Sequence, residues 1–408
     1  MLFKNVLVPL AAAVVFALSP ANAGLRSSGS AADDSVAFRL NAAHTNSIVF
    51  SGGFSANLTP LWTSHIIGPD YFMDSIVANG TVFVIQRVQA GTPGDILHAF
   101  RLSDGRELWF KKFKKHVGDG FSAPAYDNGM VFVVDQSNKV YALSASNGKT
   151  KWEVSPPKQP FSNIDPIVGN GEVFLSSDGN QKYSSIYGLD ELSGAVLWSG
   201  KLNYGGDGSP AYGGGGVYTA PPCNYYRFDA VTGVRDWYIR SRGCHGGGGL
   251  APIYLDGNIF IQDVVLPTTL SIRDAATGKN KGTLHQYWGI SPALYTDNTG
   301  ADRALTIYGD ALDTMSSWLV SSRERVWTYK LGNGATFITA PIVINGLVFV
   351  GLGGAQIAVL DANTGALLNT ITVSLSCSPS CFAAPELTAG DGALMVDEGT
   401  QLQAYVPQ

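Results

Sequence analysis

A phrase that returns at near-regular intervals constrains the fold of this chain more than any other feature. "KVYALSASNGKTKW" (139–152) is preceded by "DILHAFRLSDGRELW" and followed by "SIYGLDELSGAVLW", "YYRFDAVTGVRDW" and "IAVLDANTGALLN". Each copy is typical of two short strands joined by a tight turn, because glycine after a small polar residue permits a sharp reversal between apolar runs. Repetition at this period is the signature of a repeat architecture.

The other half of the repeat is Ala-Pro, a few residues, Gly, and then Val-Phe-Val, as in "SAPAYDNGMVFVV" and "APIVINGLVFV". The prolines are separated by 42, 44, 42, 40, 49 and 44 residues and are Pro124, Pro166, Pro210, Pro252, Pro292, Pro341 and Pro385. "DSIVANGTVFVI", with Ser75 in the proline position, is an earlier copy, so there are eight. Each unit contains four strands, A to D, where A follows the proline and D usually ends at a tryptophan. With no sustained helical period, the sequence predicts an all-β, eight-bladed β-propeller of four-stranded antiparallel blades.

The two ends of the chain predict how the ring closes. The eighth unit has no D strand after its first three, whereas a spare D-like strand, "LTPLWTS" (58–64), stands before the first unit. Adding this N-terminal strand to the last blade would complete it and remove an exposed sheet edge. We therefore expect one propeller domain over residues 58–408, preceded by a lead-in over 24–57 and a signal peptide over 1–23.

The first residues predict export. Lys4 supplies a positive start, Val6 to Leu18 an apolar core and Ala21-Asn22-Ala23 a small-residue cleavage pattern. No later segment is apolar enough for a membrane helix, so we expect a soluble protein that is secreted or periplasmic. A net charge of -5 without a broad basic stripe argues against nucleic-acid binding.

The phrases "VYALSASNGKTKW" and "IAVLDANTGALL" resemble the PQQ-like repeat of quinoprotein alcohol dehydrogenases and of the bacterial outer-membrane assembly-factor propeller. The lead-in "AFRLNAAHTNSIVF" is also similar to the segment that precedes the first blade in such proteins. The resemblance implies that the repeat tryptophans pack between neighbouring blades. These are Trp62, Trp109, Trp152, Trp198, Trp237 and Trp327.

The loops divide between two faces, because strands alternate in direction within a blade. The D-A and B-C loops are long and irregular, and the A-B and C-D turns are mostly short, so we expect the binding site on the D-A/B-C face. Polar and aromatic residues before the A strands would surround the channel mouth: Asp74, Asp119, Asp165, Asp207, His245 and Trp288. The aspartates could bind a cation or a sugar, with Trp288 as a stacking surface. The alternative is that they are ordinary turn residues, since aspartate is common in such positions.

The four cysteines fit an oxidising compartment. We expect the disulfides Cys223–Cys244 and Cys377–Cys381, each bracing loops on the D-A/B-C face. Asn57 and Asn79 would be N-glycosylation acceptors if the host is a eukaryote, because each begins an Asn-x-Thr triplet.

The activity is the least constrained property. Dehydrogenases with this repeat carry adjacent cysteines and a calcium cluster beside a catalytic aspartate, and neither can be mapped onto this sequence. We expect a non-catalytic binding or scaffold propeller, a monomer without cofactor or metal, that presents its D-A and B-C loops to a protein or glycan. The alternatives are an alcohol dehydrogenase dependent on PQQ and calcium, and another enzyme acting at the channel mouth.

Overall fold

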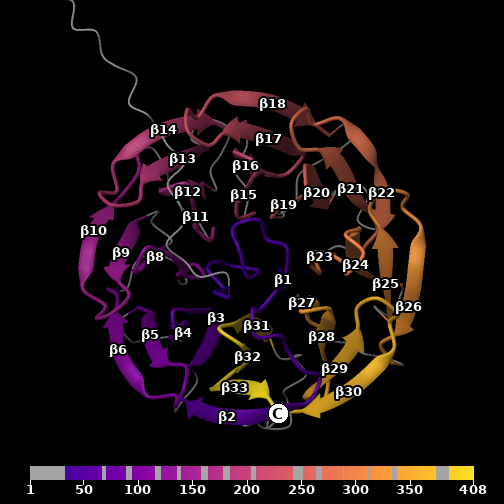
Figure 1. The fold of residues 1–408 in the computed structure, drawn as a ribbon. Helices are drawn as coiled ribbons and strands as arrows, with labels where there is room; N and C mark the ends of the chain where they lie inside the picture. The colour runs from indigo at the N-terminus through magenta and orange to yellow at the C-terminus, as the bar shows by residue number, and fades with distance from the viewer. Residues whose placement is uncertain are drawn as a thin grey trace, which may run out of the picture.

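Eight blades of four antiparallel strands, one of them extended by a short parallel strand, surround a central channel in the computed structural model, which confirms the predicted propeller (Figure 1). The structure describes residues 33–408 apart from 67–69, 89–93, 115–120, 136–138, 158–163, 178–183, 204–207, 242–250, 263–268, 288, 310–312, 333–337 and 374–385. All elements in these ranges are strands. Nothing in the described part of the chain forms a helix long and apolar enough to span a membrane.

The first four blades follow one another along the chain, each with its A strand at the channel and its D strand at the rim. Blade 1 is β3 (Tyr71–Ala78), β4 (Thr81–Arg87), β5 (Ile96–Arg101) and β6 (Glu107–Lys112). Blade 2 is β7 (Ala125–Asp127), β8 (Met130–Val134), β9 (Val140–Ser144) and β10 (Thr150–Val154). Blade 3 is β11 (Ile167–Gly169), β12 (Glu172–Ser176), β13 (Ser185–Asp190) and β14 (Val196–Lys201). Blade 4 is β15 (Ala211–Gly213), β16 (Gly216–Thr219), β17 (Asn224–Asp229) and β18 (Arg235–Arg240).

The last four blades continue the ring. Blade 5 is β19 (Ile253–Leu255), β20 (Asn258–Gln262), β21 (Thr269–Asp274) and β22 (Asn280–His285). Blade 6 is β23 (Ala293–Thr296), β24 (Asp302–Tyr308), β25 (Thr314–Leu319) and β26 (Arg325–Lys330). Blade 7 is β27 (Ile342–Ile344), β28 (Leu347–Leu352), β29 (Gln356–Asp361) and β30 (Leu367–Thr372), with β1 (Ser47–Ile48) parallel to β27. Blade 8 is β31 (Glu386–Gly390), β32 (Ala393–Glu398), β33 (Gln401–Pro407) and β2 (Leu58–His65).

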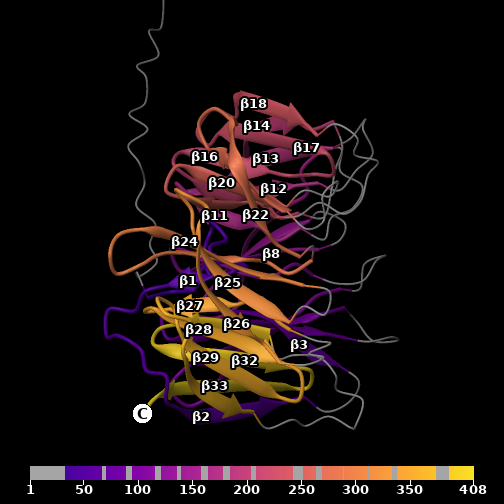
Figure 2. The same cartoon turned by 90° about the vertical axis from the view of Figure 1, so that its right-hand side faces the viewer.

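The pairing of β2 with β33 confirms the predicted closure. The two strands are antiparallel over their whole length, from Leu58 opposite Pro407 to His65 opposite Gln401. An early strand and the C-terminal strand therefore lie in one blade, with the C-terminus beside β2 (Figures 1 and 2). Because β2 takes the outermost position, the C-terminal strand is an interior strand of its sheet rather than an edge.

Each repeat tryptophan packs on the next blade, as the resemblance implied. A Cβ placed on the left-handed turn glycine Gly148 would lie 2.6 Å from Cε3 of Trp109, so only glycine leaves room for the indole. The indole N–H of Trp109 also donates to the carbonyl oxygen of Ala145, at 2.8 Å. The same pair of contacts joins Trp62 to Gly105, Trp152 to Gly194, Trp198 to Gly233, Trp237 to Gly278 and Trp327 to Gly365.

Two of the eight seams between blades use other residues. Between blades 5 and 6 the two partners are exchanged: Gly282 takes the tryptophan position, and the side chain of Arg323 lies against it. The Arg323 guanidinium donates to the carbonyl oxygen of Lys281. Between blades 7 and 8 Asn369 replaces tryptophan and donates from Nδ2 to the carbonyl oxygen of Ala56, at 3.0 Å.

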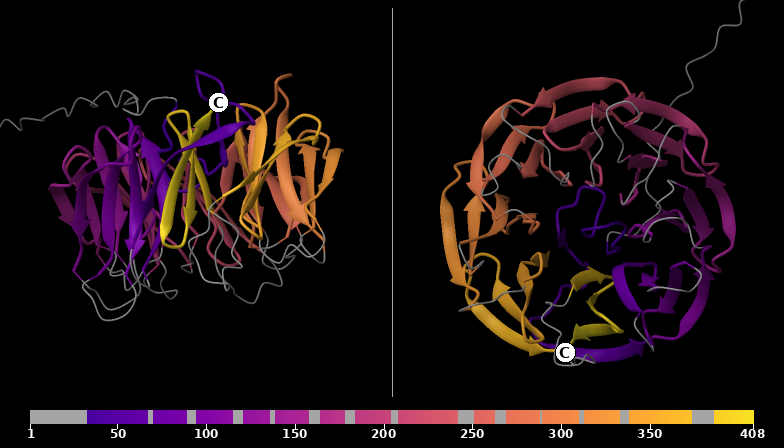
Figure 3. Two further views of the ribbon diagram at one scale, coloured as in Figure 1. Left: turned by 90° about the horizontal axis from the view of Figure 1, so that it is seen from below. Right: turned by 180° about the vertical axis from the view of Figure 1, so that it is seen from behind.

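A segment before the first strand of the ring, residues 33–50, closes one end of the channel, and we call it the channel strap. Its carbonyl oxygens accept hydrogen bonds of 2.7 to 3.0 Å from A-strand N–H groups of blades 2, 4, 5, 6 and 7. The donors all stand two residues after a repeat proline and are Tyr126, Tyr212, Tyr254, Leu294 and Val343. The strap thus pairs edge groups of the inner strands that the blades leave open. The lead-in and the C-terminus share one face of the disc (Figure 3).

Replacing Gly148 with alanine tests the contact between blades. The change requires an unfavourable left-handed backbone and also drives a Cβ into Trp109, so we expect a loss of about 3 kcal/mol in the free energy of unfolding. Gly129→Ala is the matched control, because Gly129 has a similar φ (72° against 66°) but open space where its Cβ would stand. That variant should lose about 1 kcal/mol. Equal losses in chemical denaturation would show that the indole contact contributes nothing.

Candidate functional site

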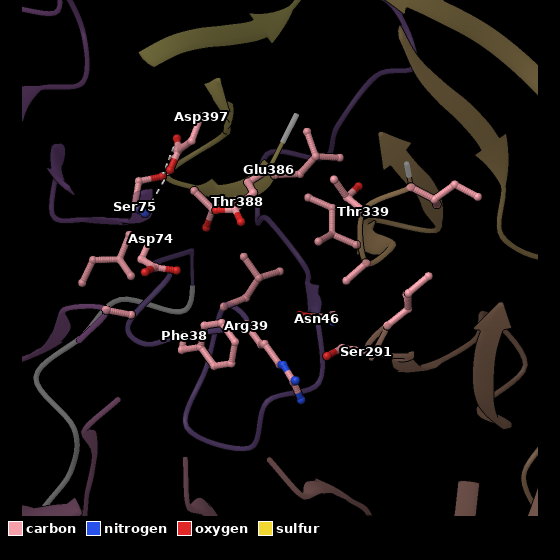
Figure 4. Close-up of a pocket in the computed structure, with 18 of the residues that line it drawn as sticks. Phe38, Arg39, Asn46, Asp74, Ser75, Ser291, Thr339, Glu386, Thr388 and Asp397 are labelled. Carbon is pink, nitrogen blue, oxygen red and sulfur yellow. Dashed lines mark hydrogen bonds between the residues drawn. The ribbon is translucent and has the colours of Figure 1, made fainter. Parts of the chain in front are cut away.

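The strongest candidate site is a cavity of about 450 Å³ within the channel (Figure 4). Its wall consists of residues at or just before the A strands of blades 1, 2, 6, 7 and 8 and of Asp397 in the B strand of blade 8. The channel strap contributes Phe38, Arg39, Leu40 and Asn46. Because A strands begin on the D-A side, the cavity lies toward the D-A/B-C face, while the strap lies across the opposite end. In Figure 4 the carboxyl groups of Asp74, Glu386 and Asp397 gather on one side, and the guanidinium of Arg39 lies away from them.

Asp74 enters the cavity because β3 is irregular. The pairing of β3 with β4 shifts between Met73 and Ile76, which leaves Asp74 and Ser75 in a bulge. Asp74 adopts a left-handed backbone conformation, with φ of 54°. Such a conformation is unusual for a residue other than glycine, and bulges commonly redirect a side chain next to a functional site. Blade 1 is also the unit in which serine replaces the repeat proline, so the departure from the repeat and the bulge coincide.

Asp397 joins the last blade to the first. Its side chain is only 6% exposed, and it accepts hydrogen bonds from the N–H and the hydroxyl of Ser75, at 3.1 and 3.0 Å. Burial raises the pKa of Asp397 to about 7, and the charge of Glu386 adds to the effect, while the bonds from Ser75 oppose it. This carboxyl group therefore takes up a proton at a pH where most carboxyl groups are ionised.

Burial also raises the pKa of the other two carboxyl groups of the cavity, those of Asp74 and Glu386. Burial raises the pKa of Asp74 well above its usual range, and the charges of neighbouring carboxylates, Asp165 first, raise it further. The side chain of Glu386 is exposed to the channel. The surrounding protein nevertheless limits its hydration and so raises its pKa, while a hydrogen bond donated by the Asp74 N–H lowers it. Three carboxyl groups that resist ionisation are suited to binding hydroxyl or amine groups, or to donating a proton.

Asp165 lies near this cluster, but its carboxylate connects two blades through hydrogen bonds. Its carboxylate accepts from the N–H of Ala123 at 2.7 Å and from the hydroxyl of Ser209 at 2.8 Å, and these residues belong to blades 2 and 4. Burial raises its pKa, and these hydrogen bonds oppose the rise. Of the six predicted site residues, Asp74 lines the cavity, whereas Asp165 is not among the lining residues. Asp119, Asp207, His245 and Trp288 lie outside the described residues.

The cavity contains functional candidates that the sequence did not indicate. Glu386 and Asp397 occur in the last blade without a distinguishing motif, and Arg39 was noted only as part of the lead-in. Burial lowers the pKa of Arg39 to about 10, and the charge of Asp165 opposes the change. His44 belongs to the strap and is fully buried, and burial, together with the Arg39 charge, lowers its pKa to about 3. Its ring is therefore neutral, with Nδ1 3.2 Å from the carbonyl oxygen of Pro252.

The described residues do not provide a metal centre. Within them, no group of three or more His, Cys, Asp or Glu side chains is placed to hold an ion. The expectation of no cofactor and no metal stays a prediction.

The modification sites are described in part. Cys223 is disulfide-bonded, while Cys244, Cys377 and Cys381 lie outside the described residues, so the pairing stays a prediction. Asn57 and Asn79 both have exposed side chains, and their glycosylation likewise stays a prediction.

The pKa of Asp397 predicts how stability depends on pH. Its folded value of about 7 exceeds its ordinary value of 3.8, so the folded protein binds more protons than the unfolded chain between these values. Stability should therefore fall as the pH rises from about 4 to about 7, which thermal melts would measure. In Asp397→Asn the decline should be shallower. Asp274→Asn is the control, because hydrogen bonding, chiefly from Thr277, lowers the pKa of Asp274 to about 2, outside this window. An unchanged decline in Asp397→Asn would contradict the assignment.

Comparison with known proteins places the chain among repeat propellers. The family profile described as outer membrane protein assembly factor BamB matches residues 93–238. A tetrathionate hydrolase of Acidithiobacillus ferrooxidans is 28% identical over 207 residues, which are 45% of this chain and 39% of the relative. BamB of Moranella endobia is 26% identical over 145 residues, 33% of this chain and 34% of the relative. This chain thus matches about two fifths or less of the length of these curated relatives.

Solved structures share the fold at low sequence identity. BamB from Moraxella catarrhalis superposes with a TM-score of 0.60 and 18% identity, covering 86% of this chain and 98% of that one. A europium-containing methanol dehydrogenase gives a TM-score of 0.68 with 12% identity and covers 91% of both chains. Together with the repeat and the ring of eight blades, these matches establish that the chain is a β-propeller of PQQ-like repeats.

Proposed function

We propose that this protein is an exported, non-catalytic binding propeller whose ligand site is the cavity at the D-A end of the channel. The observation that supports it most is the convergence of Asp74, Glu386 and Asp397 on a cavity that the strap closes from behind. Protonated or partly protonated carboxyl groups exchange hydrogen bonds with hydroxyl groups, and ionised ones pair with amines. The ligand is accordingly a glycan, or a protein segment carrying hydroxyl or basic side chains, held by the surrounding D-A and B-C loops.

The apolar part of the wall fits this ligand class. Phe38, Ile290 and Ile338 line the same cavity as the carboxyl groups. A sugar ring presents apolar C–H surfaces between its hydroxyl groups, so it matches a wall with both kinds of residue. Trp288, placed by the sequence just before the A strand of blade 6, would add the stacking surface predicted for the channel mouth.

Asp74→Asn tests the site with a control of the same chemistry. Titration of a glycan identified on an array should show at least about a tenfold loss of affinity, which corresponds to one charge-assisted hydrogen bond. Asp256→Asn is the control, because Asp256 also has a left-handed backbone, with φ of 40°, but stands exposed in the A-B turn of blade 5. Asparagine tolerates this conformation, so both variants should fold. Equal affinity in the two variants would remove the cavity from the binding site.

A hydrolase is the second candidate, and the raised pKa values favour it. A carboxyl group that keeps its proton can act as a general acid, and Asp74 is the one that the bulge holds in the cavity. The similarity to a tetrathionate hydrolase suggests tetrathionate as the substrate to test. Tetrathionate is a dianion, so it would enter this cavity when the carboxyl groups are protonated and Arg39 supplies the positive charge. Tetrathionate consumption should therefore occur only at acidic pH and should be abolished in Asp74→Asn. If tetrathionate is not consumed at any pH, the hydrolase is excluded and binding remains the proposed function.

A further inference from the structure

The channel strap brings one positive charge into the cavity. Phe38, Arg39 and Leu40 are consecutive strap residues that line it. They stand between two anchored points of the strap, Val36, which is bonded to blade 2, and Ala42, which is bonded to blade 4. Of the described residues that line the cavity, Arg39 alone is basic. The proposed ligand site therefore combines three carboxyl groups with a single guanidinium.

The backbone at Arg39 is strained. Arg39 and Leu40 are both left-handed, with φ of 58° and 75°, and two successive residues of this kind without glycine are rare. The N–H of Val36 donates to the carbonyl oxygen of Leu40, at 2.9 Å. The N–H of Asn46 donates to the carbonyl oxygen of Arg39, at 3.2 Å. Strain that the surrounding structure maintains in this way is characteristic of ligand sites, where it fixes a side chain before the ligand arrives.

The guanidinium of Arg39 has more donors than acceptors. It presents five N–H groups, and among the described residues its one hydrogen bond runs from Nη1 to the carbonyl oxygen of Ala251, at 3.3 Å. Its Nε is buried and has no hydrogen-bond partner. The ring centre of Phe38 lies 4.9 Å from Cζ, a contact that favours the cation but satisfies none of its N–H groups. Buried donors without acceptors are costly, so a ligand that supplies an acceptor gains free energy here.

No carboxylate of the protein neutralises Arg39 by direct contact. Its charge is attracted by Asp165, but the oxygens of Asp165 already accept from the Ala123 N–H and the Ser209 hydroxyl. The ion pairs found in the described part of the chain do not include this guanidinium. With a pKa of about 10, Arg39 is nevertheless charged at neutral pH. A buried cation without a contacting counterion is suited to an anionic group of a ligand.

We propose that the ligand is an acidic glycan and that Arg39 binds the carboxylate of a uronic acid. This inference rests on the function proposed above and narrows its ligand class. A carboxylate is planar and accepts two parallel hydrogen bonds from the fork of a guanidinium. The hydroxyl groups of the same sugar ring suit the carboxyl groups on the other side of the cavity (Figure 4). A neutral sugar would leave Arg39 unpaired, and a peptide carboxyl terminus has no hydroxyl groups fixed beside it.

Titration of the mature protein with uronic acid oligomers and their methyl esters tests the proposal. Oligomers of galacturonic, glucuronic and mannuronic acid form the panel, because esterification removes the charge and keeps the ring and its hydroxyl groups. At about pH 6 the sugar carboxylate is ionised and Asp397 is largely protonated. The best-bound free acid should bind at least about tenfold more tightly than its ester. Arg39→Gln should bind the two forms with equal affinity.

Two further variants separate the fork from the charge and from the backbone. Arg39→Lys keeps the charge but not the paired donors, so it should lose most of the preference for the free acid. Arg323→Gln is the matched control, because Arg323 is also left-handed, with φ of 63°, but stands exposed in the C-D turn of blade 6. It should keep the full preference.

The outcomes separate this inference from the proposed function. If the wild type binds acid and ester equally while Asp74→Asn weakens both, the inference is wrong and the binding site remains. If no member of the panel binds, the inference fails together with the glycan ligand of the proposed function. An Arg39-dependent preference for peptides with a free carboxyl terminus would overturn the inference in favour of a protein ligand. The comparison of acid and ester needs only the wild type, so it decides the question even if thermal melts show that an Arg39 variant is unfolded.

Discussion

The contact between an indole ring and a turn glycine organises this ring. A blade buries its two faces only against its neighbours, so the propeller depends on each blade meeting the next at a fixed distance and rotation. The tryptophan of one outer strand covers the glycine of the following turn and donates to a backbone carbonyl in the same turn. Packing fixes the distance, and the directional hydrogen bond fixes the rotation. A sequence that repeats these two residues at a constant spacing therefore specifies a closed ring with little else in common between its blades.

The exceptions show that each seam needs such a contact, because other side chains supply it at the two seams that lack the tryptophan. At the seam between blades 5 and 6 the bulky side chain has moved to the other partner, and Arg323 covers Gly282. At the seam between blades 7 and 8, the turn that would face Asn369 does not exist. The third and fourth strands of blade 8, β33 and β2, are far apart in the sequence and are not joined by a turn. Asn369 instead bonds to the backbone just before β2. Each seam thus contains a side chain that covers or bonds the neighbouring backbone, although three different residue types provide it.

The sequence was sufficient to predict the ring but not the site. The ring follows from patterns between residues close together in the sequence, whereas the site depends on contacts between residues far apart in it. The strands, the blade count and the closure follow from short patterns such as Gly148 with Trp152, which reappear in most units. The cavity depends instead on single departures from the repeat. Nothing in "DSIVANG" indicates that Asp74 leaves the regular ladder, and nothing in the last blade indicates that Asp397 faces Ser75. Those residues meet because the ring brings the first and last blades together, which only the folded chain reveals.

The order in which the chain is made gives the closing strand a further consequence. β2 is synthesised before blade 1, whereas its partner β33 follows only after seven blades and two strands of the eighth. The channel strap must likewise wait for blades 4 to 7 before its carbonyl groups find their donors. Blades can form locally as they appear, whereas the ring cannot close until β33 has been synthesised, and such long-range pairing is slow. A chain that stops before β33 would therefore keep its first seven blades but leave β2 and β32 as unpaired strand edges, and unpaired edges promote aggregation.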